Sequence, residues 1–151
     1  CFAEAFIDGR ELNISLLAGE TGPEVLPPAE IIFAEYPPDK VRMLCYRAKW
    51  QPDSFEYEHT RRTFDFPPQD EPLLRQLSDI STLCWDTFNL RGYARVDFRI
   101  DKAGQPWVLE VNANPCLSPD GGFVTAAVRG GLDYNGLIGR IIQDIPQKEE
   151  V

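Results

Sequence analysis

The sequence predicts an α+β fold in which a mostly antiparallel sheet packs against helices. Strand-like runs and helical segments follow one another without the regular strand–helix–strand order that builds a parallel sheet. Residues 92–116 read as two alternating strands around a Gly-containing turn, which is typical of a β-hairpin. Residues 69–90 have the spacing of an amphipathic helix. Together these three observations favour the α+β class.

Length and composition indicate one domain and argue against nucleic-acid binding, a membrane span and a zinc site. The chain has 151 residues, of which 43% are hydrophobic and 26% are charged, and this suffices for one hydrophobic core. The formal net charge of -9 argues against non-specific binding to nucleic acid. No apolar run is long enough to span a membrane, and no signal peptide is recognisable. Four widely spaced cysteines with one histidine argue against a zinc site and favour reduced thiols in the cytoplasm.

The N-terminal segment is predicted to consist mostly of strands. Residues 1–7 and 11–19 alternate as two strands, and the DGRE sequence between them favours a turn, so we expect a hairpin. Because this run starts directly at Cys1, we expect the chain to be a segment of a longer protein. Residues 24–33 predict an edge strand or a bent strand, since Pro27–Pro28 interrupts an apolar run.

The remaining segments predict one long loop and three helices. Residues 34–63 show no clear period, and we expect a loop that is either a functional lid or disordered. The helix over 69–90 presents an apolar stripe of Leu73, Leu77, Ile80, Cys84 and Phe88. Residues 124–145 predict two short helices broken at Gly130–Gly131, with Asp133 as the N-cap of the second. The last six residues are expected to form a frayed tail.

The two faces of the predicted hairpin differ in character, because alternate side chains of a strand share a face. The core-facing set is expected to be Ala94, Val96, Phe98, Ile100, Trp107, Leu109 and Val111. The opposite face carries Arg95, Asp97, Arg99, Val108, Glu110 and Asn112. A six-residue loop over 101–106 would place Asp97 opposite Glu110, and a four-residue loop would shift the pairing by one diagonal. In both cases the two carboxylates are cross-strand neighbours with their Cβ atoms roughly 5 Å apart.

The repulsion between two carboxylates this close must be offset, because it amounts to about 3 kcal/mol at an effective dielectric constant of about 20. One solution is a salt-bridged patch in which Arg95 or Arg99 offsets the charge. The other is a hard divalent cation held by Asp97, Glu110 and the side-chain oxygen of Asn112. Mg²⁺ prefers such oxygen ligands and completes its shell with water and phosphates. The spacing alone leaves both solutions open.

Two motifs on this hairpin carry a resemblance to a known family. They are Gly92-Tyr93-Ala94-Arg95-Val96-Asp97 and Leu109-Glu110-Val111-Asn112-Ala113-Asn114-Pro115. With AEAFIDGRE at 3–11 and YRAKW at 46–50, they resemble the ATP-grasp family, and within it the D-alanine–D-alanine ligases. The resemblance implies that residues 1–151 are the C-terminal portion of an ATP-grasp domain, whose N-terminal subdomain, with its glycine-rich loop, is absent from this chain.

The resemblance also implies how the nucleotide is bound. Glu4 and the backbone around Phe6 and Ile7 would hold the adenine, and Glu11 would accept hydrogen bonds from the ribose hydroxyls. Lys49 would reach a phosphate of ATP from the lid-like loop. These positions are therefore expected to form a nucleotide site.

By the same resemblance, Asp97, Glu110 and Asn112 would bind one or two Mg²⁺ ions, with Mn²⁺ as an alternative. Arg95 would stabilise the transferring phosphoryl group or the tetrahedral intermediate, so Arg95 and Lys49 are the candidate catalytic residues. The implied activity is that of a carboxylate–amine ligase: ATP phosphorylates an acid, and an amine attacks the acyl phosphate to give an amide, ADP and phosphate. The implied partners are small acids and amines, such as amino acids, and the remainder of the parent chain, and a homodimer is left open.

Four positions depart from the ligase pattern and put the substrate in question: Trp50, Cys116, Pro119 and Asp120. Cys116 stands where the family has a glycine close to the substrate, and Trp50 stands where it has Tyr or Phe beside the acceptor amino acid. Ser118 is either a substrate contact or a turn-forming residue before Pro119. Cys116 has no accompanying histidine, which argues against a covalent mechanism. These departures favour a substrate other than D-alanine.

Two alternatives to the ligase interpretation remain open from the sequence. One is a non-catalytic nucleotide-binding or interaction module with an ATP-grasp fold, and the other is a different ATP-grasp reaction such as carboxylation. The presence of Arg95, Asp97, Glu110 and Asn112 together favours catalysis. We expect the isolated segment to bind Mg·ATP weakly and to turn over little.

Overall fold

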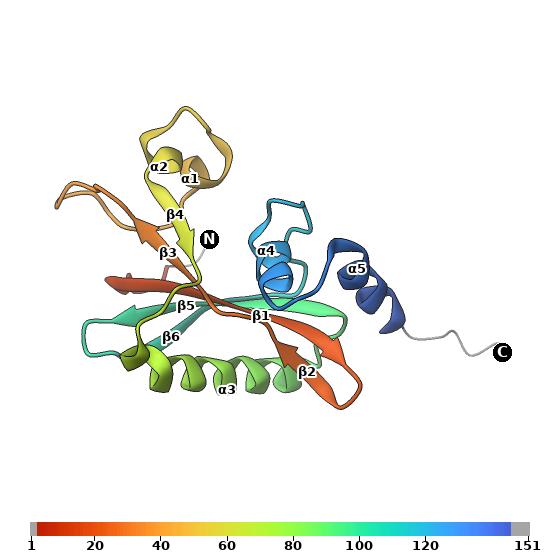
Figure 1. Cartoon of the computed structure of the whole chain (residues 1–151). Coiled ribbons are helices and arrows are strands. Elements are labelled where there is room, and N and C mark those ends of the chain that lie inside the picture. The colour runs from red at the N-terminus through yellow and green to blue at the C-terminus, as the bar shows by residue number, and fades with distance from the viewer. Residues whose placement is uncertain (1–2, 146–151) are drawn as a thin grey trace.

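The computed structural model describes residues 3–145, which form one antiparallel sheet with helices on both faces (Figure 1). The predicted α+β class and the mostly antiparallel sheet are therefore confirmed. Cys1 and the predicted frayed tail at 146–151 lie outside the described residues.

The sheet is organised around its longest strand. The strand order is β4-β3-β1-β5-β6, with β2 also paired to β1. Strand β1 pairs with β5 from Gly9–Asp101 to Leu17–Tyr93. The six strands are β1 (Gly9–Gly19), β2 (Gly22–Val25), β3 (Ala29–Phe33), β4 (Thr60–Thr63), β5 (Tyr93–Asp101) and β6 (Pro106–Asn112).

The long helix α3 covers one face of the sheet, and the shorter helices lie on the other side (Figure 1). The predicted helix over 69–90 is confirmed as α3, preceded by one 3₁₀ turn, and the predicted helix pair is confirmed as α4 and α5. Asp133 caps α5 by accepting a hydrogen bond from the Gly136 amide at 2.6 Å. The helical elements are α1 (Tyr46–Trp50), α2 (Phe55–Glu58), η1 (Pro68–Asp70), α3 (Glu71–Thr87), α4 (Gly122–Arg129) and α5 (Tyr134–Gln143).

The main hydrophobic core lies between the sheet and α3. Its buried members are Leu12, Ile14, Leu16, Leu77, Trp85, Ala94, Val96, Phe98 and Ile100. The predicted stripe on α3 is correct for Leu73, Leu77, Ile80 and Cys84, which pack in this core. It is wrong for Phe88, which is 61% exposed because the helix ends at Thr87. Trp85 occupies the core at this end of the helix instead.

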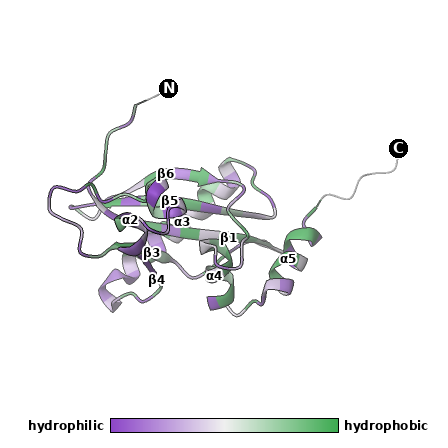
Figure 2. Cartoon of the chain, turned by 90° about the horizontal axis from the view of Figure 1, so that it is seen from above, coloured by the Kyte–Doolittle hydropathy of each residue, from purple (hydrophilic) through white to green (hydrophobic). Residues whose placement is uncertain are grey.

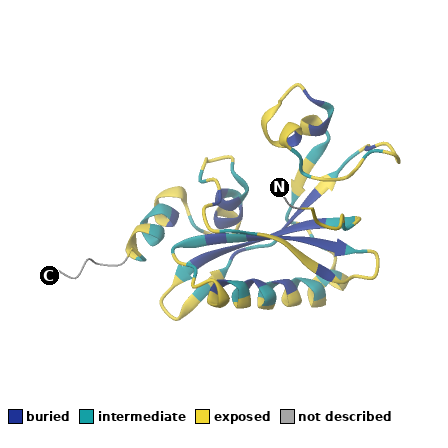
Figure 3. Cartoon of the chain, turned by 180° about the vertical axis from the view of Figure 1, so that it is seen from behind, coloured by how far each residue is buried: buried dark blue, intermediate teal, exposed yellow. Residues whose placement is uncertain are grey.

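A second, smaller core covers only one end of the opposite face. It consists of Leu17, Leu26, Phe123, Val124, Ala126, Ala127 and Leu137, from the sheet, α4 and α5. Hydrophobic and hydrophilic residues alternate along the strands (Figure 2), and the buried residues concentrate in the central strands (Figure 3). The remainder of this face is left to polar side chains, which build the site described below.

The predicted N-terminal hairpin is wrong. Residues 3–8 have no regular structure, and β1 starts inside the DGRE sequence at Gly9. The hairpin partner of β1 is β2, and its other neighbours are β3 and β5. Gly9 pairs with Asp101 at the start of β1, and the position requires glycine because an added Cβ atom would lie 1.8 Å from the carbonyl oxygen of Ile100. This glycine therefore permits a close backbone approach rather than a turn.

The segment around Pro27–Pro28 is bent, as one of the two predicted alternatives requires. The prolines separate β2 from β3. The edge-strand alternative is wrong for β3, because β3 pairs with β1 on one side and with β4 on the other.

The expected loop over 34–63 contains α1, α2 and β4, so the prediction of an irregular segment is wrong for the residues of these three elements. These elements are packed by aromatic rings: the centroids of Tyr36 and Phe55 lie 5.4 Å apart, and those of Phe55 and His59 lie 4.0 Å apart. Helices of four or five residues are too short to show a period in the sequence.

The predicted hairpin of β5 and β6 is confirmed, but its alternation is broken by a bulge. Asp97 pairs with Glu110 as predicted, whereas Phe98 pairs with Val108, so Leu109 is an extra residue. Trp107 consequently opposes Arg99 rather than facing the core. The prediction that Trp107 and Leu109 face the core is therefore wrong, and these side chains are 49% and 51% exposed. The placement of Val108 on the polar face is also wrong, because the inserted residue brings it opposite Phe98.

Leu77→Ala should lower the free energy of unfolding by about 2–5 kcal/mol, because it removes a fully buried side chain between α3 and the sheet. Leu83→Ala on the same helix is the matched control. Leu83 is 64% exposed, so its truncation should change stability by no more than about 0.5 kcal/mol. Urea unfolding followed by circular dichroism measures both effects. Equal losses in the two variants would contradict the packing of α3.

Candidate active site

A row of buried polar side chains crosses the face of the sheet opposite α3. It is formed by Glu11 and Asn13 of β1 and by Asp97 and Arg99 of β5, which are 3–7% exposed. Because side chains alternate along a strand, these residues point away from the core that their neighbours form. Charges at such low exposure require partners, and the contacts below provide them.

Asp97 is held by three hydrogen bonds. The Arg95 guanidinium donates through Nε at 2.6 Å to Oδ1 and through Nη2 at 2.7 Å to Oδ2. Asn13 Nδ2 donates to Oδ1 at 2.9 Å. Burial lowers the pKa of Arg95, but the hydrogen bonds and charge of Asp97 and the charge of Glu110 outweigh it, so that the pKa is raised overall. Arg95 therefore offsets the charge of Asp97.

Glu11 is paired with Arg99, its neighbour across the β1–β5 ladder. Arg99 Nη1 donates to Glu11 Oε2 at 3.1 Å, and the Leu44 amide lies 3.4 Å from the same oxygen. Burial raises the pKa of the Glu11 carboxyl above its ordinary value, against the opposing charges of Arg99 and Lys49. The carboxylate is thus turned toward Arg99 and is not part of the cavity described below.

Arg99 also anchors the segment that precedes β1. Its Nε donates to the carbonyl oxygen of Ile7 at 3.0 Å, and its Nη2 donates to that of Arg42 at 2.7 Å. The guanidinium carbon lies 5.2 Å from the centroid of the Phe6 ring, which is 56% exposed. Glu4 is exposed farther along the same segment. One arginine therefore fixes both chain segments that border Glu11.

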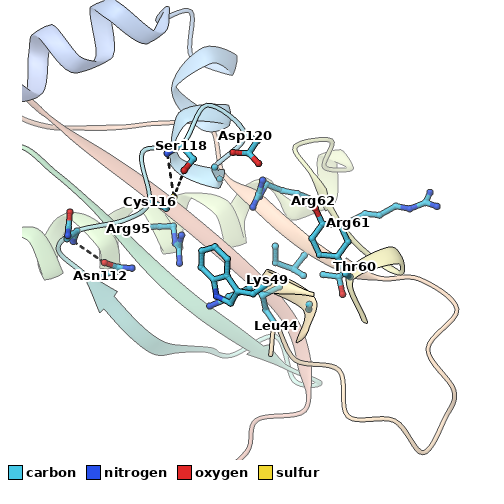
Figure 4. A pocket seen from close by; sticks show the side chains of 17 residues that line it. Leu44, Lys49, Thr60, Arg61, Arg62, Arg95, Asn112, Cys116, Ser118 and Asp120 are labelled. Carbon is cyan, nitrogen blue, oxygen red and sulfur yellow. Dashed lines mark hydrogen bonds between the residues drawn. The ribbon is translucent and has the colours of Figure 1, made fainter. Parts of the chain in front are cut away.

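A cavity of about 660 Å³ lies beside this polar face (Figure 4). Its walls come from α1, from β4, from the polar ends of β5 and β6, and from the loop over 113–122. Six of the sequence-predicted site residues line it: Lys49, Trp50, Arg95, Asn112, Cys116 and Ser118. The other six do not line it: Glu4, Phe6, Ile7, Glu11, Asp97 and Glu110.

The sequence analysis assigned no site role to six polar residues of this cavity: Thr60, Arg61, Arg62, Tyr57, Asn114 and Asp120. The first three belong to β4, which lies in the segment that shows no period. The paired arginines were visible in the sequence, but only the fold shows that Arg62 points toward the 113–122 loop and that Arg61 points away from it (Figure 4).

The loop over 113–122 is organised by its own polar side chains. Asn112 Oδ1 accepts a hydrogen bond from the Asn114 amide at 2.9 Å, and Asn114 Oδ1 accepts one from the Tyr93 hydroxyl at 2.6 Å. Cys116 Sγ lies 3.2 Å from Ser118 Oγ. The hydrogen bonds of Ser118 lower the pKa of the Cys116 thiol below its ordinary value. The loop thus presents an acidic thiol and a hydroxyl at the cavity wall.

The ligand chemistry of Asp97, Glu110 and Asn112 fits a hard divalent cation. Two carboxylates and an amide oxygen lie on neighbouring strands in the register Asp97–Glu110 and Arg95–Asn112. Glu110 is exposed, and within residues 3–145 its carboxylate accepts no protein hydrogen bond. The same part of the chain has no group of three His, Cys, Asp or Glu side chains placed to hold a metal, so an ion here would need the amide of Asn112 as its third protein ligand.

Known proteins resemble this chain in sequence and in fold. The family model described as D-ala D-ala ligase C-terminus matches residues 1–143. Protein y4sG of Sinorhizobium fredii is 37% identical over 145 residues, covering 92% of this chain and 39% of that protein. A D-alanine–D-alanine ligase of Synechococcus sp. is 30% identical over 151 residues, covering 99% of this chain and 42% of the ligase.

Among solved structures, the D-alanine–D-alanine ligase of Bacillus anthracis complexed with ATP has a TM-score of 0.66 and 22% identity, covering 92% of this chain and 38% of that one. At this identity the likeness concerns the fold. The chain spans about two fifths of the length of the curated relatives that it matches. In the described residues, no helix is both long and apolar enough for a membrane crossing.

The stability of the fold should decrease as the pH rises from about 4.5, the ordinary pKa of glutamate, through the raised pKa of folded Glu11. Because burial raises this pKa, the folded chain binds the proton more tightly than the unfolded chain, and the penalty of the ionised form is absent at lower pH. Glu11→Gln should lack this part of the pH dependence. Urea unfolding of both proteins between about pH 4 and pH 8 tests this, and a stability difference that does not vary with pH would contradict it.

Cys116 should be alkylated faster than Cys84 at neutral pH. The hydrogen bonds of Ser118 lower the pKa of Cys116, whereas burial raises the pKa of Cys84, and the thiolate is the reactive form. Ser118→Ala should slow the reaction at Cys116 and leave Cys84 unchanged. Iodoacetamide labelling followed by peptide mass spectrometry measures both rates. An unchanged rate at Cys116 in the variant would show that Ser118 does not activate the thiol.

Proposed function

The chain belongs to the D-alanine–D-alanine ligase family by its C-terminal domain, and we propose that the full-length protein is an ATP-dependent ligase that joins a carboxylate to an amine. The observation that carries this proposal is the placement of Arg95, Asp97, Glu110 and Asn112 on two neighbouring strands beside a cavity that Lys49 also lines. Relatives whose names state ligase activity, one of them complexed with ATP, support the same reaction class.

In the proposed reaction the acid substrate attacks the γ-phosphorus of ATP, which breaks the bond to ADP and gives an acyl phosphate. The amine then attacks the acyl carbon, and inorganic phosphate leaves as the amide forms. A Mg²⁺ ion held by Asp97, Glu110 and Asn112 would neutralise phosphate charge during the transfer. Arg95 and Lys49 are two of the cationic side chains that line the cavity, and both would stabilise the transferring group.

The proposed nucleotide seat lies on the side of the polar face that Arg99 organises. Glu4 and the backbone near Phe6 and Ile7 would hold the adenine, and Glu11 would bind the ribose. Arg99 supports this proposal because it bonds both to Glu11 and to the carbonyl of Ile7, so that the two stretches keep a fixed relative position. The charge of Lys49 acts on Glu11, which supports the proposal that this lysine reaches a phosphate from the same side.

The acid and amine substrates would bind in the cavity, against the wall formed by Trp50, Cys116 and Ser118. Closure of the segment that carries α1 and α2 would keep water from the acyl phosphate. We propose a cytoplasmic location for the full-length protein, where ATP is available and where its free thiols stay reduced.

Asp97→Asn and Glu110→Gln should each reduce Mg²⁺-dependent phosphate release from ATP by at least about 100-fold, because each removes one charge from the proposed metal site. The measurement is phosphate release by the full-length protein in the presence of amino-acid pairs, with the Mg²⁺ concentration varied.

The matched control is Asp79→Asn, which removes a carboxylate that is exposed on α3, across the sheet from the site. Its phosphate release should equal that of the unmodified protein. Full release by both Asp97→Asn and Glu110→Gln would end the metal assignment.

A further inference from the structure

We propose that the cavity selects a substrate that carries a carboxylate beyond the groups that react, such as the side chain of an acidic amino acid, and that Arg62 binds this carboxylate. The inference rests on the proposed function and deepens it, because it assigns a substrate class to the same site. Its two supports are the position of Arg62 and the charge balance of the residues that line the cavity.

Arg62 connects two parts of the cavity wall that are distant in the sequence, β4 and the start of α4. It lies on β4, where it pairs with Ile31 of β3, and its side chain reaches the start of α4 (Figure 4). A Cβ atom added to Gly122 would lie 2.9 Å from Arg62 Nη2 and 3.0 Å from its Cζ. The guanidinium therefore packs directly against the glycine that opens α4, beside the loop that carries Cys116 and Ser118.

The charge of Arg62 is not balanced by the protein. The cationic side chains that line the cavity are Lys49, Arg61, Arg62 and Arg95, whereas Asp120 is the one carboxylate among the lining residues. Arg95 already forms an ion pair with Asp97. Within residues 3–145, no carboxylate lies close enough to Arg62 to form an ion pair.

The pKa of Arg62 reflects the same imbalance. Burial lowers it, the nearby charge of Arg95 lowers it further, and Asp120 opposes both. An arginine keeps its proton under all ordinary conditions, so the consequence is an uncompensated cation beside a cavity. A bound anion would relieve the repulsion between Arg62 and Arg95.

A carboxylate fits this position better than a phosphate. The planar guanidinium matches a carboxylate with two parallel hydrogen bonds. Asp120 lies near enough for its charge to act on Arg62, and it would repel a dianionic phosphate more strongly than a monoanionic carboxylate.

The test uses the full-length protein with three variants. Arg62→Gln removes the charge and keeps much of the side-chain length. Gly122→Ala keeps the charge but displaces the guanidinium by steric contact. Arg75→Gln is the control, because Arg75 is an exposed arginine of α3, across the sheet from the cavity.

Binding is measured by calorimetry and turnover by phosphate release from ATP. The probes are D- and L-aspartate, D- and L-glutamate, D- and L-alanine, and D- and L-phosphoserine. We expect an acidic amino acid to bind more tightly than alanine of the same configuration. Arg62→Gln should weaken that binding by about 10- to 100-fold, as expected for the loss of charge-assisted hydrogen bonds. The KM for ATP and the binding of alanine should stay unchanged.

Gly122→Ala should weaken the binding of the acidic amino acid less than Arg62→Gln does, and Arg75→Gln should not weaken it. Binding that depends on Arg62 supports the inference even if no pair of substrates releases phosphate, in which case the proposed ligase function fails alone. A second outcome is that alanine supports phosphate release, that Arg62→Gln leaves this release intact, and that acidic amino acids are not preferred. This outcome overturns the inference and keeps the ligase function. Preference for phosphoserine, or a rise in the KM for ATP in Arg62→Gln, would also overturn it.

Discussion

The structure depends on the pairing of buried charges across its central strands. Glu11, Asp97 and Arg99 lie almost entirely out of contact with solvent on the polar face of the sheet. An unpaired charge in such a place costs several kcal/mol, so each must be matched. Arg99 pairs with Glu11, and Arg95 pairs with Asp97. The remaining donors of Arg99 hold the carbonyls of Ile7 and Arg42, so the same pairing also positions the chain segments around the sheet.

This pairing also defines what must change when the proposed site is used. In this structure both oxygens of Asp97 accept hydrogen bonds from Arg95. On the proposed function, a cation that takes Asp97 as a ligand releases the guanidinium, which then needs another anion. The γ-phosphate of ATP would provide that anion. Metal binding and phosphate binding would thus support each other, because each supplies the charge that the other displaces.

The sequence predicts those parts of the molecule that repeat a local pattern. The period of α3 and the glycines between α4 and α5 were sufficient to place these helices. The pairing of Asp97 with Glu110 was predicted correctly, but the loop length was not: Ile100 pairs with Pro106, so the loop is one residue shorter than the expected 101–106, and the extra residue Leu109 restores the predicted pair. The two hairpin motifs were sufficient to predict that Arg95 and Asn112 belong to the site, and both line the cavity.

The parts that the sequence did not predict depend on contacts between distant residues. The extra residue Leu109 changes which side chains face the core, and no local signal marks it. The two helical turns of α1 and α2 are stabilised by ring contacts such as that of Tyr36 with Phe55. Arg62 joins the cavity only because β4 pairs with β3 and thereby faces the start of α4.

The bulge at Leu109 has a consequence for how the sheet meets other chains. In the part of the chain that the structure describes, β6 is an edge strand, and it exposes Trp107, Val108 and Leu109 in succession. A flat apolar edge of this kind would favour aggregation by strand addition. The inserted residue interrupts the regular row of backbone donors and acceptors and increases the local twist. The irregularity therefore protects an otherwise adhesive edge from intermolecular sheet growth.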